Sequence, residues 1–206
     1  MCKKQIILLG AGGHCRSCID IIEMQKLFTI AGIVERKEYS GTSPVSGYRV
    51  LGHDSELPDL SRRFNHAFIT VGYMGAAGIR KRLYSLLVKL GFSIPVIVSP
   101  RAYVSKHAQL GRGTIVMHDA CVNAGAVIGE NCIINTKALV EHDVVIGDNT
   151  HVSTSAVVNG ASKIGSGCFL GSNSTVVNGI TLPDNNFFRA GALIRNGKDG
   201  KYIKEV

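Results

Sequence analysis

A histidine between two carboxylates is the clearest candidate for catalysis in this chain of 206 residues. The segment Glu141-His142-Asp143 places an imidazole, which titrates near neutral pH, beside groups that can fix its tautomer. Such a base can take the proton from an attacking nucleophile. A lone histidine is more often a packing or surface residue, so the flanking acids single out His142 among seven histidines. Either carboxylate could support the ring.

A glycine-rich turn near the N-terminus is a candidate anion site. The apolar run Gln5–Leu9 leads into Gly10–Gly13, and an amphipathic segment follows, which predicts a strand, a tight turn and a helix N-terminus. Cys15 replaces the third glycine of a dinucleotide motif, and an ordinary turn is the alternative. Glu35 closes the next strand, where an acid can contact a nucleoside. With three or four strands, we expect one nucleotide with a short phosphate tail rather than NAD.

A strict six-residue repeat fills the C-terminal half. From Val104 to Ile194 every sixth residue is apolar, sixteen times in succession. Neither a helix nor a flat strand has this period, whereas a triangular coil of three hexapeptides does, and sixteen hexapeptides make about five coils. We expect the apolar residue to fill the interior and the mostly small residue four positions later to turn the corner. Gly160 would then stack one coil above His142.

Residues 1–97 have a different pattern and are expected to form a separate domain from residues 98–206. Strand candidates alternate with helix candidates, which is typical of a small parallel sheet with crossover helices. The expected fold class is α/β, a Rossmann-like βαβαβ sheet domain followed by a parallel β-helix. The strand candidates are Gln5–Leu9, Thr29–Val34, Ala67–Val71 and Ile94–Val98, a polar loop covers Ser40–Ser46, and a second helix covers Ala76–Leu90.

Composition narrows the partners and the location. The net charge is +8, but no basic run exceeds three residues and aromatic residues make up 6%. This favours phosphorylated small molecules over nucleic acid. No apolar run reaches 18 residues and no signal peptide precedes the glycines, so we expect no membrane span and a cytoplasmic protein with reduced cysteines. Cys15 and Cys18 form one C-x-x-C pair without a second pair for zinc.

Six stretches of the chain resemble one family in order and spacing, over about residues 4–195. They are the opening Gly10–His14 and the segments Gly47–Gly52, Ile69–Gly72, Ile79–Leu83, Val140–Gly147 and Asn149–Ser153. These stretches resemble the nucleotide-sugar acetyltransferases of the left-handed β-helix superfamily. The nearest groups are bacterial enzymes that N-acetylate UDP-4-amino-4,6-dideoxy sugars, with sialic-acid O-acetyltransferases as close relatives.

The resemblance implies roles for the rod residues. His142 matches the general base, with Asp143 or Glu141 beside it. Gly160 would aim its N–H at the thioester oxygen, although a glycine needed only for the corner is the alternative.

The resemblance also implies the rest of the acetyl-CoA site. Asn135 and His151 match residues that line this site. The rods would form a homotrimer with acetyl-CoA between neighbours. Metal is not expected, because His142 and His151 are nine residues apart, unlike the five-residue spacing in the zinc-binding rods of carbonic anhydrases.

The resemblance assigns the nucleotide sugar to the N-terminal domain. Gly12, Gly13 and His14 would line the diphosphate, Glu35 would accept a hydrogen bond from the nucleoside, and Gly72 would pack close to the ligand.

The expected function is acetyl-CoA-dependent N-acetylation of a nucleotide-linked amino sugar, most similar to a UDP-4-amino-4,6-dideoxy sugar, for bacterial glycan biosynthesis. O-acetylation of a sialic-acid-type sugar and a non-catalytic trimer that binds sugar nucleotides are the alternatives. One departure concerns the C-terminus, where residues 196–202 replace the Gly-x-Pro-Ala-Lys signature that is common in this family.

Overall fold

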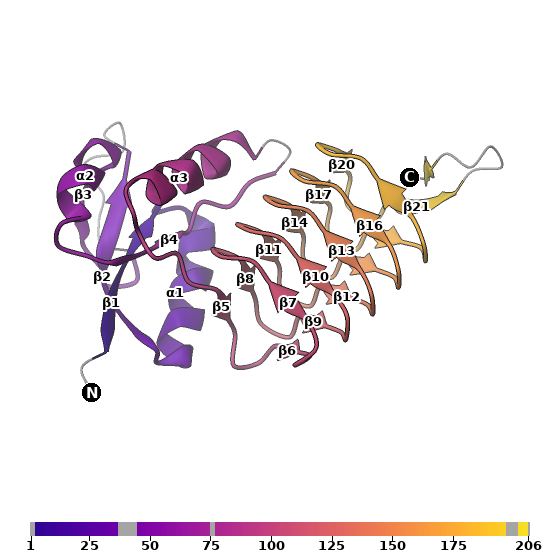
Figure 1. Ribbon diagram of the computed structural model, residues 1–206, viewed down its shortest axis with the longest axis horizontal. Coiled ribbons are helices and arrows are strands. Elements are labelled where there is room, and N and C mark those ends of the chain that lie inside the picture. The colour runs from indigo at the N-terminus through magenta and orange to yellow at the C-terminus, as the bar shows by residue number, and fades with distance from the viewer. Residues whose placement is uncertain (1–2, 37–44, 75–76, 197–201, 206) are drawn as a thin grey trace. The chain divides into compact units, whose positions relative to one another are not determined.

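The protein folds into two compact units, shown in Figure 1. The computed structural model describes residues 3–36, 45–74, 77–196 and 202–205. The first unit comprises Met1–Gly72 and Gly78–Ile97, and the second comprises Tyr73–Ala77 and Val98–Val206. Within the described residues, no helix is long and apolar enough to cross a membrane.

The first unit is a four-stranded parallel sheet with the strand order β3-β2-β1-β4. Residues 6–9 of the inner strand β1 have no exposed surface, because both faces of this strand are covered. This burial explains why the strand is an unbroken apolar run. The elements are β1 (Lys4–Leu9), α1 (Gly13–Gln25), β2 (Phe28–Glu35), β3 (Val50–His53), a 3-10 turn (Asp54–Glu56), α2 (Leu57–Leu60), β4 (His66–Ile69) and α3 (Gly78–Lys89).

Two features of this unit differ from the sequence-based expectation. β3 was not predicted, because all four of its residues are half-buried and show no alternation. The predicted strand at Ile94–Val98 is wrong for this sheet. Only Ile97–Val98 (β5) is a strand, and it joins a sheet of the rod. The predicted helix start at Ala76, and most of the loop Ser40–Ser46, lie outside the described residues.

Buried polar side chains fix the carboxyl end of β4. The Thr70 hydroxyl, fully buried, contacts the carbonyl oxygens of Leu9 (2.8 Å) and Gly10 (2.6 Å). The Arg80 guanidinium, also fully buried, donates to the carbonyl oxygens of Ile69 (2.7 Å) and Val71 (3.0 Å). Hydrogen bonds to a charged donor are stronger than neutral ones. These hydrogen bonds therefore hold the backbone in place where the glycine-rich turn begins at Gly10.

The second unit is a parallel β-helix with three sheets, one for each side of a triangular coil. Strands 18 residues apart pair in parallel, for example β12 with β15. The five-strand sheet has the order β19-β16-β13-β10-β7, the six-strand sheet β20-β17-β14-β11-β8-β5, and the seven-strand sheet β22-β21-β18-β15-β12-β9-β6. The strands are β6 (Tyr103–Val104), β7 (Gln109–Leu110), β8 (Ile115–Val116), β9 (Cys121–Val122), β10 (Val127–Ile128), β11 (Ile133–Ile134), β12 (Leu139–Val140), β13 (Val145–Ile146), β14 (His151–Val152), β15 (Val157–Val158), β16 (Lys163–Ile164), β17 (Phe169–Leu170), β18 (Thr175–Val176), β19 (Thr181–Leu182), β20 (Phe187–Phe188), β21 (Leu193–Asn196) and β22 (Tyr202–Glu205).

The corners of the coil are turned by a different residue from the one expected. From 113 to 191, the residue three positions after each interior apolar residue has a positive φ, fourteen times in succession. The small residue four positions after it is instead buried in the interior, as at Ala138 and Ala156. The left-handed conformation favours glycine, asparagine and aspartate. This preference accounts for Asn131, Asn149 and similar residues at the corners.

The last strand of the rod runs against the direction of the others. β22 pairs antiparallel with β21, whereas β21 pairs in parallel with β18. The seven-strand sheet therefore ends in a strand that breaks the repeat.

Candidate active site

The candidate base lies at the corner between the seven-strand and five-strand sheets, after β12. His142 Nδ1 is 2.9 Å from Asp143 Oδ2, and both side chains are well exposed, at 60% and 69%. A carboxylate can only accept a hydrogen bond, so Nδ1 carries the proton and the lone pair of the neutral ring is on Nε2. Asp143 reaches this position from the left-handed corner, with φ of 59°.

The second carboxylate is held away from the ring. Glu141 Oε2 accepts hydrogen bonds from Asn123 Nδ2 (3.0 Å), one coil earlier, and from the backbone N–H of His142 (3.3 Å). These contacts tie Glu141 to the neighbouring coil. The geometry therefore favours Asp143 as the partner of the imidazole.

Gly160 packs against the free nitrogen of the ring. A Cβ atom added at this glycine would lie 2.6 Å from His142 Nε2. The corner itself does not require glycine, because Ala124 and Ala190 occupy the same place in their hexapeptides and Gly160 is not among the positive-φ residues. The alternative of a glycine needed only for corner conformation is therefore not favoured.

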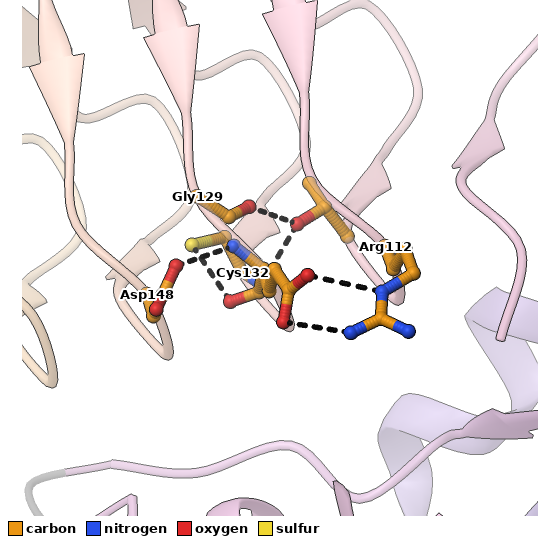
Figure 2. Close-up of polar contacts among 6 residues, drawn as sticks. Arg112, Gly129, Cys132 and Asp148 are labelled. Atoms are coloured by element: carbon orange, nitrogen blue, oxygen red, sulfur yellow. Dashed lines mark hydrogen bonds and ion pairs between the residues drawn. The ribbon is translucent and has the colours of Figure 1, made fainter. Parts of the chain in front are cut away.

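The N–H of Gly160 is in a position that binds anionic oxygen elsewhere in the rod. At the equivalent place, the Glu130 N–H donates to Asp148 Oδ1 (2.7 Å), a contact drawn as a dashed line from Asp148 in Figure 2. The Ser166 N–H likewise donates to Asp184 Oδ1 (2.7 Å). Within the described residues, the Gly160 N–H donates to no protein acceptor. It is therefore available to an external acceptor such as an oxyanion.

Asn135 and His151 form a second polar group. His151 Nδ1 is 3.0 Å from the carbonyl oxygen of Tyr73, so this nitrogen is the donor, and Nε2 (3.0 Å) accepts from Asn135 Nδ2. Asn135 Oδ1 accepts from the backbone N–H of Thr136 (2.8 Å), which fixes the amide orientation. His151 is only 6% exposed and packs edge-on against Phe169.

Sequence reasoning missed Tyr73. Its hydroxyl donates to the carbonyl oxygens of Asn149 and Cys168, and its ring packs against His151. A single tyrosine after a glycine carries no sequence signal for this contact.

The structure brings the rod residues together in two groups rather than one. His142, Asp143 and Gly160 lie at the corner between the seven-strand and five-strand sheets. Asn135 lies at the other corner of the seven-strand sheet, with His151 on the adjoining six-strand sheet. The width of one sheet separates the groups within a coil.

The proposed nucleotide residues surround the first turn of the first unit. Glu35 Oε2 accepts from the Ala11 N–H, and Oε1 accepts from the Arg36 N–H (2.8 Å), so this carboxylate braces the turn. Each oxygen keeps a second lone pair for a ligand. A Cβ atom added at Gly72 would lie 3.1 Å from His14 Cβ, so these two residues are neighbours.

The first turn of α1 is open and carries no acidic side chain of its own. Gly12 is the N-cap without a side-chain hydrogen bond, and no acidic residue lies in the first turn. A Cβ atom added at Gly12 or Gly13 would meet nothing within 4 Å. The helix N-terminus therefore offers backbone N–H groups and positive potential to an anion.

The cysteines do not form a redox or metal site among the described residues. Cys15 and Cys18 are fully buried, and burial raises the pKa of both thiols. The thiols therefore stay neutral and weakly reactive. Within the described part of the chain, no group of three or more histidine, cysteine or acidic residues could hold a metal ion.

Two family models match this chain, one in the sheet domain and one in the rod. The PglD N-terminal domain family matches residues 5–87, and the bacterial transferase hexapeptide family (six repeats) matches residues 125–160. The N-terminal part of the chain is therefore similar to PglD-type domains, and the rod is similar to hexapeptide-repeat transferases. The expected resemblance is thereby confirmed. Comparison with curated proteins returned no significant match.

Solved structures of hexapeptide-repeat sugar acetyltransferases are similar over nearly the full length. The acetyltransferase domain of PglB from Neisseria gonorrhoeae is 29% identical, with a TM-score of 0.84 and coverage of 94% of this chain and 92% of that chain. A structure of the PglB domain with acetyl coenzyme A is 27% identical, with a TM-score of 0.80 and coverage of 94% and 96%.

A second similar protein has been solved with both a cofactor and a sugar nucleotide. It is a histidine-to-asparagine variant of perosamine N-acetyltransferase from Caulobacter crescentus, in complex with CoA and GDP-perosamine. This structure is 28% identical, with a TM-score of 0.85, and the match covers 98% of this chain and 97% of that chain. The expected fold, a small parallel sheet followed by a left-handed parallel β-helix, is confirmed.

Proposed function

We propose that this hexapeptide-repeat protein transfers the acetyl group of acetyl-CoA to the amine of a nucleotide-linked sugar. The carrying observation is the His142–Asp143 pair with its free Nε2 against Gly160, whose N–H has no protein acceptor among the described residues. The similar structures with CoA and GDP-perosamine, or with acetyl coenzyme A, support both co-substrates. A UDP-linked 4-amino-4,6-dideoxy sugar is our first candidate acceptor.

The chemistry follows from the free nitrogen and the adjacent N–H. The neutral sugar amine attacks the thioester carbonyl carbon, and His142 Nε2 takes the proton that the nitrogen loses. Asp143 stabilises the imidazolium that results. The Gly160 N–H donates to the oxyanion. When the C–S bond breaks, the imidazolium returns the proton to the sulfur, so CoA leaves as the thiol and the amide remains.

The first unit supplies the anchor for the nucleotide in this proposal. Gly12, Gly13 and His14 lie at the start of α1 and would hold the diphosphate. Glu35 would accept from the nucleoside. Gly72, which packs on His14, would keep the backbone close to the ligand.

The proposal is tested by incubating the protein with acetyl-CoA and a panel of UDP-, GDP- and dTDP-linked amino sugars and following thiol release. Release with at least one amino sugar, and acetyl amide in the product, is expected. A product acetylated on oxygen would support the sialic-acid-type alternative. Binding of sugar nucleotides without any thiol release would support the non-catalytic alternative.

Valine at Gly13 should weaken the binding of the nucleotide sugar and leave the binding of acetyl-CoA unchanged. The new side chain would extend into open space beside the helix N-terminus, so we expect KM for the sugar nucleotide to rise about tenfold or more, with KM for acetyl-CoA unchanged. Steady-state kinetics with each co-substrate varied will show this split. Gly78→Val is the matched control, since Gly78 also begins a helix and faces open space. A rise in KM for acetyl-CoA alone would place the nucleotide elsewhere.

A homotrimer would join the two groups of rod residues, and we include it in the proposal. The two corners of the seven-strand sheet carry His142 and Asn135. If three rods turn this sheet toward a common axis, the His142 corner of one chain meets the Asn135 corner of the next. The outward column of this sheet is mostly apolar, as a buried face requires. Its members are Tyr103, Cys121, Leu139, Val157, Thr175 and Leu193.

We also propose a cytoplasmic location.

A charge in this column should dissociate the trimer. Val157→Glu would bury an unpaired carboxylate, so the mass by light scattering at micromolar concentration should fall from three times 22.0 kDa towards 22.0 kDa, and activity should fall with it. Val127→Glu is the control, because Val127 is 39% exposed on the five-strand sheet. A monomeric wild-type protein, or an active monomeric variant, would contradict the assembly.

A further inference from the structure

Gly125 lies one coil below Asp143, at the same corner of the rod. Both residues have the left-handed conformation, with φ of 75° and 59°. A Cβ atom added at Gly125 would overlap Asp143 Oδ1 and come within 3.4 Å of the Asp143 backbone nitrogen. The Asp143 carboxylate thus folds back over the preceding coil and occupies the space that a side chain at 125 would need.

The corner turn by itself does not demand glycine at 125. Of the fourteen successive left-handed corner residues, nine carry side chains. Asn131 and Asn149 are stacked one coil apart in this conformation, and Asn131 Nδ2 donates to Asn149 Oδ1 (2.9 Å). Two side chains can therefore stack at a corner when they hydrogen-bond to each other from one coil to the next. At 125 the requirement comes from the orientation of the Asp143 carboxylate.

We infer that Gly125 is a positioning residue for the base. Its missing side chain lets Asp143 Oδ1 rest against the preceding coil, which turns Oδ2 to within 2.9 Å of His142 Nδ1. The Asp143 N–H, which donates to the Ala124 carbonyl (3.1 Å), keeps the corner in the stack. The histidine–aspartate pair thus fits between two glycines, Gly125 in the coil below and Gly160 in the coil above.

The first test measures the tautomer of His142 and needs no catalytic activity. In ¹⁵N-histidine spectra at a pH where the ring is neutral, we expect the wild-type proton on Nδ1. Gly125→Ala should displace the carboxylate and move a large share of the proton to Nε2. Gly167→Ala is the matched control, because it has a similar φ of 68° and its Cβ would lie 2.5 Å from Asn185 Oδ1 at another corner. An unchanged tautomer in Gly125→Ala would overturn the inference, whatever the substrate proves to be.

The second test rests on the proposed function and measures whether Gly125 acts through Asp143. Gly125→Ala should lower kcat about tenfold to a hundredfold, as expected when a reacting group is misplaced by about 1 Å. KM for acetyl-CoA should stay within about twofold. Asp143→Ala should have a similar effect, and the double variant should be no worse than about twofold below either single variant. Losses that multiply would overturn the inference.

Backbone strain is measured separately in the same experiment. Gly191 has a φ of 73°, and a Cβ atom added there would meet nothing within 4 Å, so Gly191→Ala is the control. This variant carries the left-handed penalty without displacing a side chain, so its kcat should match the wild type. A loss of kcat in Gly191→Ala as large as in Gly125→Ala would assign the effect to strain and contradict a positioning role.

Discussion

Alanine at His142 is expected to lower kcat/KM by about 10²–10⁴, the usual contribution of a general base. The loss should fall on kcat, because the amine can no longer pass its proton to Nε2. Acetyl-CoA affinity, measured by titration calorimetry, should change little. The pairing of Nδ1 with Asp143 at 2.9 Å leaves Nε2 as the basic nitrogen, and this is the basis of the expectation.

His107→Ala is the control for this variant. His107 is an exposed histidine at the same corner of the rod, two coils earlier, and its loss should leave kcat/KM within about twofold. Activity of His142→Ala within about threefold of the wild type would show that another group takes the proton. His151 would then be the next candidate, although its Nε2 already accepts from Asn135.

Alanine at Gly160 is expected to lower kcat/KM by about 10²–10³, within the range for the loss of a general base. The methyl group would lie 2.6 Å from Nε2 and 2.7 Å from Cε1 of His142, so the ring must leave its place against this glycine. The substitution would therefore displace the base while keeping the backbone N–H.

The folded state should tolerate the same change. Ala124 and Ala190 already occupy the equivalent corner position, and the displaced imidazole is an exposed side-chain end. We expect the thermal midpoint of Gly160→Ala to stay within a few degrees of the wild type. In a His142→Ala background, where the ring is absent, the substitution should cause little further loss, because alanine keeps the backbone N–H. Full activity of Gly160→Ala would show that the base does not need a glycine at this position.

The rod was predictable because its period is a property of the sequence itself. An apolar residue at every sixth position has one geometrical explanation, and the interior residues from Val116 to Ile194 are buried as expected. The residue that turns each corner was harder to predict from the sequence. Two positions in each hexapeptide are often small or polar, and only the backbone φ values show that the third, rather than the fourth, is left-handed.

The contacts within the site depended on side-chain direction, which a sequence does not specify. Glu141 and Asp143 are equally close to His142 along the chain, yet one reaches Asn123 in the coil below and the other reaches the ring. Tyr73 contacts a histidine 78 residues away, beyond the reach of any local pattern. The short strand β3 was missed because its half-buried residues have no period.

The antiparallel strand at the end of the rod bears on whether copies of the rod can polymerise. A parallel β-helix ends in unpaired N–H and C=O groups that match its own first coil, so copies could add end to end into a fibre. β22 occupies the exposed edge of β21 in the opposite direction, and a further parallel coil cannot continue from it in register. Removal of residues 197–206 should therefore increase light scattering on concentration, with the number of chains per particle growing without a fixed limit.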